Sequence, residues 1–361
     1  MKRLTSMLAL FLCLITSGQA FAVVVEDLYA VELPVADQTT TQRLEVFKQA
    51  FKEVIIKVSG TTTALEQPGF DRPLNNSARY VRQFRYITRK TETADTFDAG
   101  QLILRVQFDQ DAIENLLREY NIPVWGKERP STLLLISFDV NKNASIVSGD
   151  TTPDVIEELE QLARRQGLPV LFPLLDLEDR LQFGIRDIID GNEANIEVAA
   201  ARYAADAVLT GQIVGRAGEG WQGVWQVRFA DQLFSWSYRA GSRQEVMQQG
   251  ISYLAQTLAL EYALDTQAET EQQILFRVDG MTALGDHVRV LSYLQSLDAV
   301  ASARLVLIHE DRVTYRIDLR NSADDLSRLI GLGNVLEQQD LPQINAASDD
   351  QTVIMDYRLI K

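Results

Sequence analysis

Hydrophobic positions along the chain repeat with two different periods, one typical of helices and the other typical of strands. The first clear helix pattern covers residues 44–58, where the hydrophobic residues fall on one helical face. Thr39 and Gln42 precede it at the spacing of a capping box, and Gly60 follows it as a typical helix end. The pattern therefore predicts a helix that begins just after Thr39 and ends before Gly60.

In residues 102–108 the hydrophobic pattern changes from the helical period to alternation, with a hydrophobic residue at every second position. The alternation predicts a strand with one well-buried face, and Asp109 is a suitable N-cap for a following helix. A further strand is predicted within residues 27–35. Together these elements predict a first α+β domain over residues 23–122.

The next segment, residues 123–130, has no period and mixes two prolines and a glycine with charged residues. This composition is typical of a linker. Trp125 lies in the predicted linker beside Gly126, so it is the tryptophan that we expect to be most available to a ligand.

A continuous hydrophobic run marks the start of a second domain. Residues 133–136 form this run, which is typical of a strand covered on both faces. A helix that opens at Thr152-Pro153 and ends at Gly167 separates the run from a second predicted strand, residues 168–175. Strand, helix and strand in this order predict a parallel pair joined by a crossover.

The second half of this domain has the strongest patterns in the chain. Residues 215–220 form a glycine-rich turn, and residues 221–229 alternate so that two tryptophans share one strand face. Residues 247–262 predict a helix with a single apolar stripe, which would bury that face. We therefore expect a middle α/β domain over residues 131–265.

The last part of the chain, residues 274–361, has the pattern strand, helix, strand, strand, helix, strand. This βαββαβ order is the ferredoxin-like pattern. The fold class predicted for the whole chain is therefore mixed, α/β and α+β, in three small modules.

The N-terminus has the pattern of a secretory signal peptide. Lys2 and Arg3 precede nine consecutive apolar residues, 7–15, and Ala20-Phe21-Ala22 offers a cleavage site. We predict a signal peptide over residues 1–22 and a periplasmic location, with an uncleaved N-terminal anchor as the alternative. No later stretch reaches the roughly 18 apolar residues that a membrane span needs.

Cys13 is the only cysteine, and it lacks the small preceding residue of a lipid-anchor signal. After cleavage the chain would be cysteine-free, which excludes disulfides, thiolate metal sites and a cysteine nucleophile. The 35 basic and 50 acidic residues give a net charge of −15, and loss of Lys2 and Arg3 makes it −17. Such a charge disfavours binding to nucleic acid or to an anionic membrane.

Three acidic residues form the first candidate site, because Asp176, Glu178 and Asp179 follow the predicted strand 168–175. Sites in open parallel sheets gather at the carboxyl ends of strands. Two carboxylates can hydrolyse a glycosidic bond and several can hold calcium, but spacing alone fixes neither geometry. The simpler interpretation is a solvated helix start, where the helix dipole favours acids.

Other reactive groups are poorly represented. His287 and His309 are the only histidines, and they supply too few ligands for zinc and have no nucleophile motif beside them. Trp125 is the candidate for stacking on a sugar ring or docking a protein. We therefore predict no catalytic residue, no metal and no cofactor, and we take Trp125 and the three acids as the ligand-binding candidates.

One further pattern is the order of six groups of short segments. These are Leu28–Gln38, Lys57–Gly60, Trp125-Gly126 with Arg129-Pro130, Gly167–Val170, Pro173–Asp176 and Arg202–Asp206. Their order resembles an exported proteobacterial family, domain of unknown function 2066, over nearly the whole chain after residue 22. The resemblance implies a location in the Gram-negative envelope, but it implies no activity, substrate or catalytic residue.

Residues 205–211, with the hairpin and long helix that follow, resemble another group of domains. These are the N-terminal domain of the Tol translocation protein and domains of flagellar and curli assembly factors. That resemblance implies an interaction module, although a fold alone does not fix a function.

These observations favour a non-catalytic periplasmic protein that acts as an interaction or assembly accessory module with other envelope proteins. The alternative is a protein that binds peptidoglycan or another glycan. A third hypothesis is a carboxylate-dependent hydrolase that uses Asp176 or Asp179. The sequence leaves the partner and the oligomeric state open.

Overall fold

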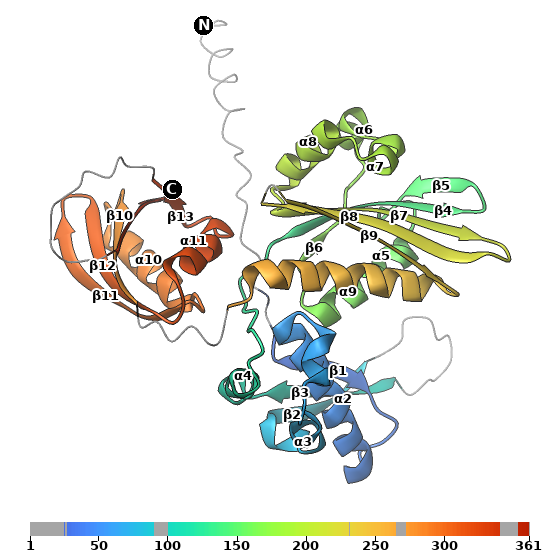
Figure 1. Ribbon diagram of the computed structural model, residues 1–361, viewed down its shortest axis with the longest axis horizontal. Helices are drawn as coiled ribbons and strands as arrows, with labels where there is room; N and C mark the ends of the chain where they lie inside the picture. The colour runs from blue at the N-terminus through green and yellow to red at the C-terminus, as the bar shows by residue number, and fades with distance from the viewer. Residues whose placement is uncertain are drawn as a thin grey trace, which may run out of the picture.

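The structure, a computed structural model, describes residues 25, 27–89, 100–230, 232–264, 272–339 and 353–360. The predicted signal peptide, residues 1–22, lies outside these ranges. The described residues form three β-sheets, each with its own helices, around the long helix α9 (Arg243–Tyr262) (Figure 1). The strands of the three sheets lie within residues 30–108, 132–240 and 273–359. In the described ranges, no helix is long and apolar enough to cross a membrane.

The first domain is a three-stranded antiparallel sheet in the order β1-β3-β2, with α2 packed against it. Its elements are β1 (Ala30–Pro34), α2 (Thr40–Ser59), α3 (Asp71–Asn75), β2 (Val81–Arg89), β3 (Gln101–Phe108) and α4 (Gln110–Glu119), with short 3-10 turns at Thr62–Glu66 and Ser77–Tyr80. Both predicted helix starts are present, since the side chains of Thr39 and Asp109 accept hydrogen bonds from backbone N–H groups. The hydrophobic faces of α2 and β3 form the core.

Residues 61–89 contain elements that the hydrophobic pattern does not indicate. β2 is an edge strand whose residues are all exposed or half-buried. A strand that buries neither face has no hydrophobic alternation, so its sequence carries no strand signal.

The middle domain has a six-stranded sheet in the order β5-β4-β7-β8-β9, with β6 paired to β4. Its strands are β4 (Thr132–Val140), β5 (Asn143–Ile146), β6 (Val170–Leu171), β7 (Ala207–Arg216), β8 (Gly220–Phe229) and β9 (Gln232–Ala240). Its other helices are α5 (Pro153–Gln166), α6 (Leu177–Gln182), α7 (Ile185–Asp190) and α8 (Glu193–Tyr203). β4 is parallel to both β6 and β7, which confirms the predicted crossover.

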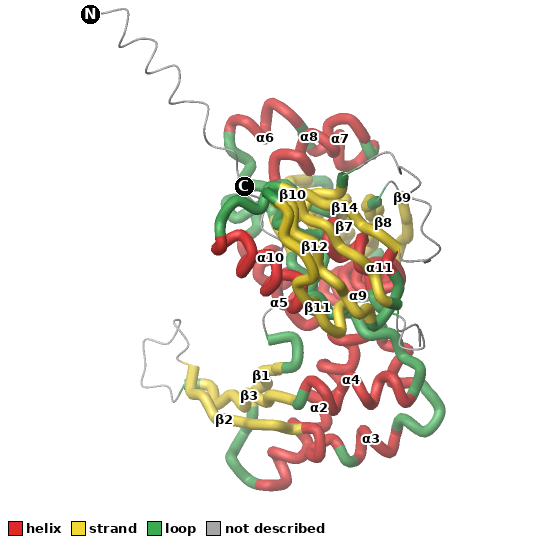
Figure 2. Tube along the Cα trace, turned by 90° about the vertical axis from the view of Figure 1, so that its left-hand side faces the viewer, coloured by secondary structure: helices red, strands yellow, loops and turns green. Residues whose placement is uncertain are grey.

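Helices cover both faces of this sheet, with α5 and α9 on one face and α6–α8 on the other (Figure 1). Leu134 and Ile136 of β4 lie in the core with α5 and α9, whereas Leu133 and Leu135 lie in the core with α7 and α8. The continuous hydrophobic run of β4 therefore contributes to the hydrophobic cores on both faces of the sheet. Figure 2 shows the sheet of the first domain below α5 and α9.

The second predicted strand of this domain is shorter than expected. Only Val170 and Leu171 pair with β4, and the rest of residues 168–175 does not. Pro169 and Pro173 flank this pair, and proline has no N–H to donate to a sheet. The chain therefore leaves the sheet at this point and turns into α6.

Helix α9 lies directly over Trp225 of β8. The predicted apolar stripe of α9, which includes Met247 and Ile251, is buried, and so is Trp225. Gly250 makes this approach possible, because a Cβ at Gly250 would lie 2.5 Å from the Trp225 ring. The predicted burial of this tryptophan under the helix is confirmed.

The last domain has a five-stranded sheet in the order β11-β12-β10-β14-β13. Its elements are β10 (Gln273–Asp279), α10 (Leu284–Ser296), β11 (Val300–His309), β12 (Arg312–Leu319), α11 (Ala323–Gly331), β13 (Leu336–Gln338) and β14 (Val353–Leu359). β10 and β14 are parallel, and the other pairs are antiparallel. The predicted order βαββαβ is present, with the short strand β13 added before the last strand.

The predicted linker, residues 123–130, is not an exposed connection, which corrects the sequence prediction. Residues 125–130, here called the junction segment, are buried except for the half-buried Lys127. They lie where the three domains meet. The composition of the segment suggests an exposed linker, but its polar groups are buried because they bond to distant parts of the chain.

Backbone hydrogen bonds connect residues 124–127 to each of the three domains. The Trp125 N–H donates to the Val58 carbonyl of α2 at 2.7 Å. Val124, just before the segment, forms a bridge with Leu264 after α9.

The third tie comes from the last domain. The Lys127 N–H donates to Oδ2 of Asp298, which lies between α10 and β11, at 3.1 Å. Gly126 has to be glycine there, because a Cβ would lie 1.7 Å from the same Asp298 oxygen.

Arg129 is the centre of the junction, with 1% of its surface exposed. Its guanidinium stacks on the Trp125 ring, 4.0 Å from the centroid. All five of its N–H groups donate to backbone carbonyls. The acceptors, at 2.7–3.1 Å, are the oxygens of Gly126, Gln166, Gly167, Lys57 and Trp125.

These acceptors explain how a buried cation is tolerated without a hydrogen-bonded carboxylate. Lys57 lies in the last turn of α2, and Gln166 and Gly167 end α5. Helix C-termini carry unpaired carbonyls and partial negative charge, which stabilise a cation. Burial lowers the pKa of Arg129 to about 9, so the side chain remains charged at neutral pH.

We predict that Arg129→Met lowers the free energy of unfolding by about 3–5 kcal/mol, because methionine keeps the apolar stem and leaves buried carbonyls without donors. Urea denaturation followed by tryptophan fluorescence measures the change. The matched control is Arg164→Met on α5, whose exposed ion pair with Glu160 contributes about 0–0.5 kcal/mol. Equal stability of the two variants would contradict a structural role for Arg129.

Candidate functional site

A cleft of about 820 Å³ lies between the first and middle domains. One wall consists of β1 together with Glu53 and Lys57 of α2. The other wall consists of the last turns of α5 and the segment that follows it, residues 167–169. The ends of α2 and α5 that form these walls are the same two helix ends that Arg129 joins.

Charged side chains dominate this cleft. The cations are Lys57, Arg89, Arg105, Arg164 and Arg165, and the anions are Asp27, Glu32 and Glu53. A chain with a net charge of −15 thus has a cavity in which cations outnumber anions.

Two of the three anions are already paired. Arg105 bonds to Asp27 at 2.5 Å and to Glu32 at 2.9 Å, and Arg89 bonds to Glu32 at 2.8 Å. Hydrogen bonds from Arg105 and then from Arg89 hold the pKa of Glu32 below its ordinary value. Glu32 therefore stays ionised, and Asp27 and Glu32 together compensate the two arginines of the first domain.

The α5 wall keeps its positive charge. Arg164 makes only the exposed pair with Glu160 at 3.2 Å, and Arg165 is exposed. Glu53 across the cleft has its pKa raised by burial, an effect that the nearby charge of Arg165 opposes. An anion in the cleft would face Arg164 and Arg165 directly.

The backbone of β1 is the other feature of the cleft. β3 pairs with only one edge of β1, to which Val35 N–H and Tyr29 O also belong. Alternation along an antiparallel strand turns the backbone groups of Ala30 and Glu32 toward the opposite edge. Lys57 Nζ donates to the Ala30 carbonyl there at 3.0 Å, and burial lowers the pKa of Lys57 to about 8.

The cleft therefore combines a strand edge with exposed arginines. Such a lining can hold an extended anionic chain through backbone bonds and charge.

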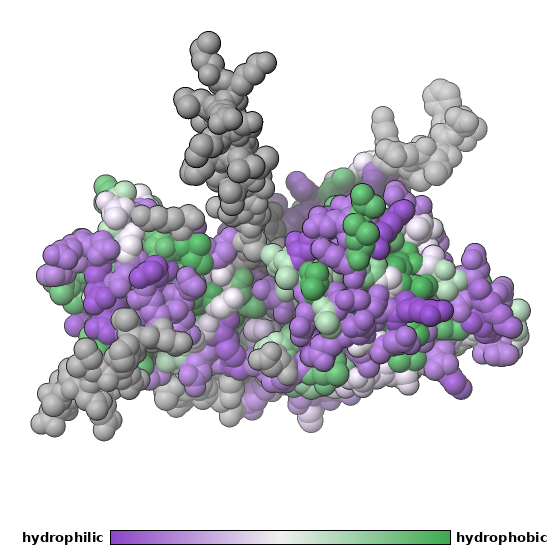
Figure 3. Space-filling model, turned by 90° about the horizontal axis from the view of Figure 1, so that it is seen from above, coloured by the Kyte–Doolittle hydropathy of each residue, from purple (hydrophilic) through white to green (hydrophobic). Residues whose placement is uncertain are grey.

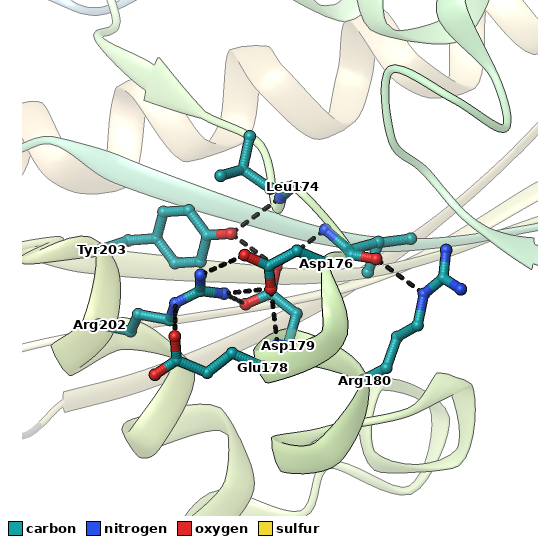
Figure 4. A network of polar contacts seen from close by, with 8 residues as sticks. Leu174, Asp176, Glu178, Asp179, Arg180, Arg202 and Tyr203 are labelled. Atoms are coloured by element: carbon teal, nitrogen blue, oxygen red, sulfur yellow. Dashed lines mark hydrogen bonds and ion pairs between the residues drawn. The ribbon is translucent and has the colours of Figure 1, made fainter.

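The predicted acidic residues Asp176, Glu178 and Asp179 do come together, on α6 far from this cleft, and all three bond to Arg202 of α8 (Figure 4). Arg202 Nη2 lies 2.6 Å from Asp176 Oδ2, and Nε lies 3.4 Å from Glu178 Oε2. Nη1 bonds to Asp179.

Further hydrogen bonds close the cluster. Asp179 is fully buried and accepts from the Leu175 N–H at 2.8 Å and from the Tyr203 hydroxyl at 2.7 Å. Asp176 caps α6 by accepting from the Asp179 N–H at 3.0 Å. The carboxylates thus hold α6 against α8, and Asp179 presents no oxygen to solvent.

The electrostatics of this cluster agree with a structural role. Hydrogen bonds from Arg202 hold the pKa of Asp176 at about 2, below its ordinary value of 3.8, so this group is no proton donor at neutral pH. Within the described ranges, no group of three or more His, Cys, Asp or Glu residues is arranged to hold a metal ion.

Trp125 is not available to a ligand, which corrects its placement in an exposed linker. Its side chain is fully buried between Arg129 and the C-terminal end of α9. It lies on the α9 side of the middle sheet, whereas the acidic cluster lies on the α6–α8 side (Figure 1). The structure therefore does not bring Trp125 and the acids into one site.

Sequence patterns missed the residues that matter most in the structure. Arg129 and Arg202 occur in the segments that carried the family resemblance, but neither has a local signal of burial or pairing. In the sequence, Arg164 and Arg165 are typical of the solvent-exposed last turn of a helix. Only their position opposite β1 makes them part of a cleft.

Comparison with known proteins adds a family match for the first domain. Residues 22–126 match the family model of a domain of unknown function (DUF8605). The match ends inside the junction segment and covers less than a third of the chain. It indicates an uncharacterised family, and a different one from domain of unknown function 2066.

One solved structure is similar to part of the chain. It is the lipoprotein GNA1162 from Neisseria meningitidis, with 17% identity over 36% of this chain and 96% of that chain, and a TM-score of 0.21. A TM-score this low does not establish a shared fold. No curated protein matches the chain.

The Arg202 cluster generates a prediction about pH. Asp176→Asn keeps the helix cap and removes the charge that Arg202 stabilises. The pKa of Asp176 is about 2 in the folded protein and 3.8 ordinarily. Its ionised form therefore stabilises the fold fully when the pH is above 3.8, and this stabilisation is lost as the pH falls toward about 2.

Wild type should therefore melt at a higher temperature than Asp176→Asn at neutral pH, and the difference should vanish between about pH 4 and pH 2. Thermal denaturation in a pH series measures this. Asp190→Asn, an exposed acid on α7, serves as the control. A difference that is independent of pH would contradict the pairing with Arg202.

Proposed function

We propose that this chain is a non-catalytic interaction protein of the Gram-negative cell envelope, and that its inter-domain cleft holds an extended, acidic segment of a partner protein. The observation that carries this proposal is the excess of cations in the cleft of an otherwise acidic chain. Charge of this kind selects anionic partners and speeds their association.

The shape of the cleft supports a chain-like ligand. On the open edge of β1 the Ala30 N–H already donates to the Asp27 carbonyl and the Ala30 carbonyl accepts from Lys57. Glu32 therefore offers the backbone groups for an added strand, and Pro34 limits the addition to a short segment. Arg164 and Arg165 stand on the opposite wall, where they can pair with acidic side chains or with a C-terminal carboxylate.

The location rests on the sequence. The predicted signal peptide supports an exported envelope protein. The likeness of the middle domain to Tol, flagellar and curli accessory domains supports an assembly role. The hydrogen bonds that connect the junction region to all three domains support it as well.

The alternative functions have less support in the structure. A glycan-binding protein loses its stacking candidate, since Trp125 is buried. A hydrolase that uses Asp176 or Asp179 would need one of them to have a raised pKa, whereas Asp176 has a lowered one and Asp179 is sequestered by three partners.

Site-specific photocrosslinking tests the proposal. A benzoylphenylalanine residue at Gln161, which lines the cleft, should capture an envelope protein in intact cells. The charge reversal Arg164→Glu with Arg165→Glu should lower the yield about tenfold, because it removes two charge-assisted contacts. The control reverses Arg186 and Arg239, which are also exposed but lie outside the cleft.

Capture that the cleft reversal leaves unchanged would contradict the proposed site. Titration with muropeptides, followed by tryptophan emission, separates the glycan alternative from it. A response to muropeptides without any captured protein would favour the glycan-binding function instead.

A further inference from the structure

Among the residues that the structure describes, strand β11 forms one edge of the last sheet and pairs with β12 only. It is ten residues long, and its second half is exposed. Four consecutive apolar residues there expose 44–59% of their surface. They are Leu305, Val306, Leu307 and Ile308.

Four other edge strands in the described sheets are protected in ways that β11 is not. β5 and β13 are only four and three residues long, and β1 ends at a proline. β2 carries three arginines along its length. Short strands, prolines and charges are the usual devices against unwanted pairing, and between Leu305 and Ile308 β11 has none of these.

The pairing of β11 with β12 has one register shift between Val300 and Ser302 and a second, within the apolar run, between Leu305 and Leu307. The second shift leaves Leu307 and Ile308 opposite Thr314 and Val313 of β12, so the strand continues beyond it. The apolar edge therefore remains open to another strand.

Helix α10 extends the apolar surface. Leu284 and Val288 lie one turn apart on α10, which packs against β11, and they are 80% and 56% exposed. Tyr293 on the other flank of α10 contacts Gly333, next to α11. Leu284 and Val288 thus lie on the flank that points away from α11, on the β11 side of the sheet.

The charges at the two ends of the apolar run indicate what covers it. Arg304 precedes the run and is largely exposed, with only a 3.4 Å contact to Asp318. Glu310 and Asp311 follow the run in the turn to β12 and are exposed. A second copy placed antiparallel would bring its acids to Arg304 and its Arg304 to the acids of the first copy.

From this self-complementarity we infer that β11 is a dimerisation edge, at which a second copy of this chain adds its own β11 in an antiparallel pair. A two-fold axis near Leu307 would extend the sheet across both copies and satisfy both sets of charges. A parallel arrangement would place like charges together. This inference is independent of the cleft and of the proposed function.

The oligomeric state of residues 23–361 provides the first test. Light scattering after size-exclusion chromatography, over a dilution series, should show a concentration-dependent dimer. Leu307→Lys should give a monomer with an unchanged circular dichroism spectrum. The control Leu177→Lys changes a leucine that is 76% exposed on α6, and it should remain dimeric.

Charge exchange tests the antiparallel register. Arg304→Glu and Glu310→Arg should each weaken the dimer about tenfold, because each creates two repulsive contacts by symmetry. The double variant should restore the affinity of the wild type, since it exchanges the charges between the strands.

Cysteine crosslinking tests contact at the axis, because the only natural cysteine, Cys13, is absent from residues 23–361. Directly opposed residues on antiparallel strands have Cα atoms about 4.5–5.5 Å apart, within disulfide range. Leu307→Cys should therefore form a disulfide-linked dimer on oxidation, and the control Leu177→Cys should not.

Wild-type protein that is monomeric over the whole dilution series would overturn the assignment. A dimer that survives Leu307→Lys would overturn it as well, because the contact would then lie elsewhere. The α6 side is the first place to look in that case: Figure 3 looks onto that side, where hydrophobic side chains (green) gather among hydrophilic ones (purple).

Discussion

Burial of a single cation, Arg129, is the constraint on which the arrangement of this protein depends. A guanidinium in a dry interior needs all of its donors satisfied, and here only backbone carbonyls satisfy them. Those carbonyls come from the ends of α2 and α5 and from the junction segment, so the charge is neutralised only when the first and middle domains are docked. The cleft exists for the same reason, because its walls are the last turns of these two helices.

The distribution of charge matters more than its total. The chain is strongly acidic, yet some of its acids are paired with arginines: Asp176, Glu178 and Asp179 surround Arg202, and Asp27 and Glu32 surround Arg105. On the wall of the cleft, Arg164 has an exposed pair with Glu160, and Arg165 has only the nearby charge of Glu53. A net charge of −15 therefore coexists with a local surface that attracts anions.

The two proposed contact regions lie on different domains and depend on different interactions. The cleft in the first half of the chain relies on charge and on a short strand edge, whereas β11 in the last domain relies on apolar area and edge pairing. A two-fold dimer through β11 would carry two clefts on one rigid body. A partner with repeated acidic segments would then bind both with a gain from effective concentration.

Periodicity alone determined the elements that bury one face locally: the helices around residues 44–58 and 247–262, the strand at 102–108 and the βαββαβ order of the last domain. Periodicity does not indicate β2, because this strand buries neither face. It predicts too long a strand at β6, where the flanking prolines end the pairing. It also does not predict the functional sites. Whether Trp125 is exposed, and whether Asp176 is reactive, depends on Arg129 and Arg202, whose partners lie up to 72 residues away in the chain. Hydrophobic patterns record how each segment meets its own core, whereas the pairing of buried charges is decided only when distant segments are brought together.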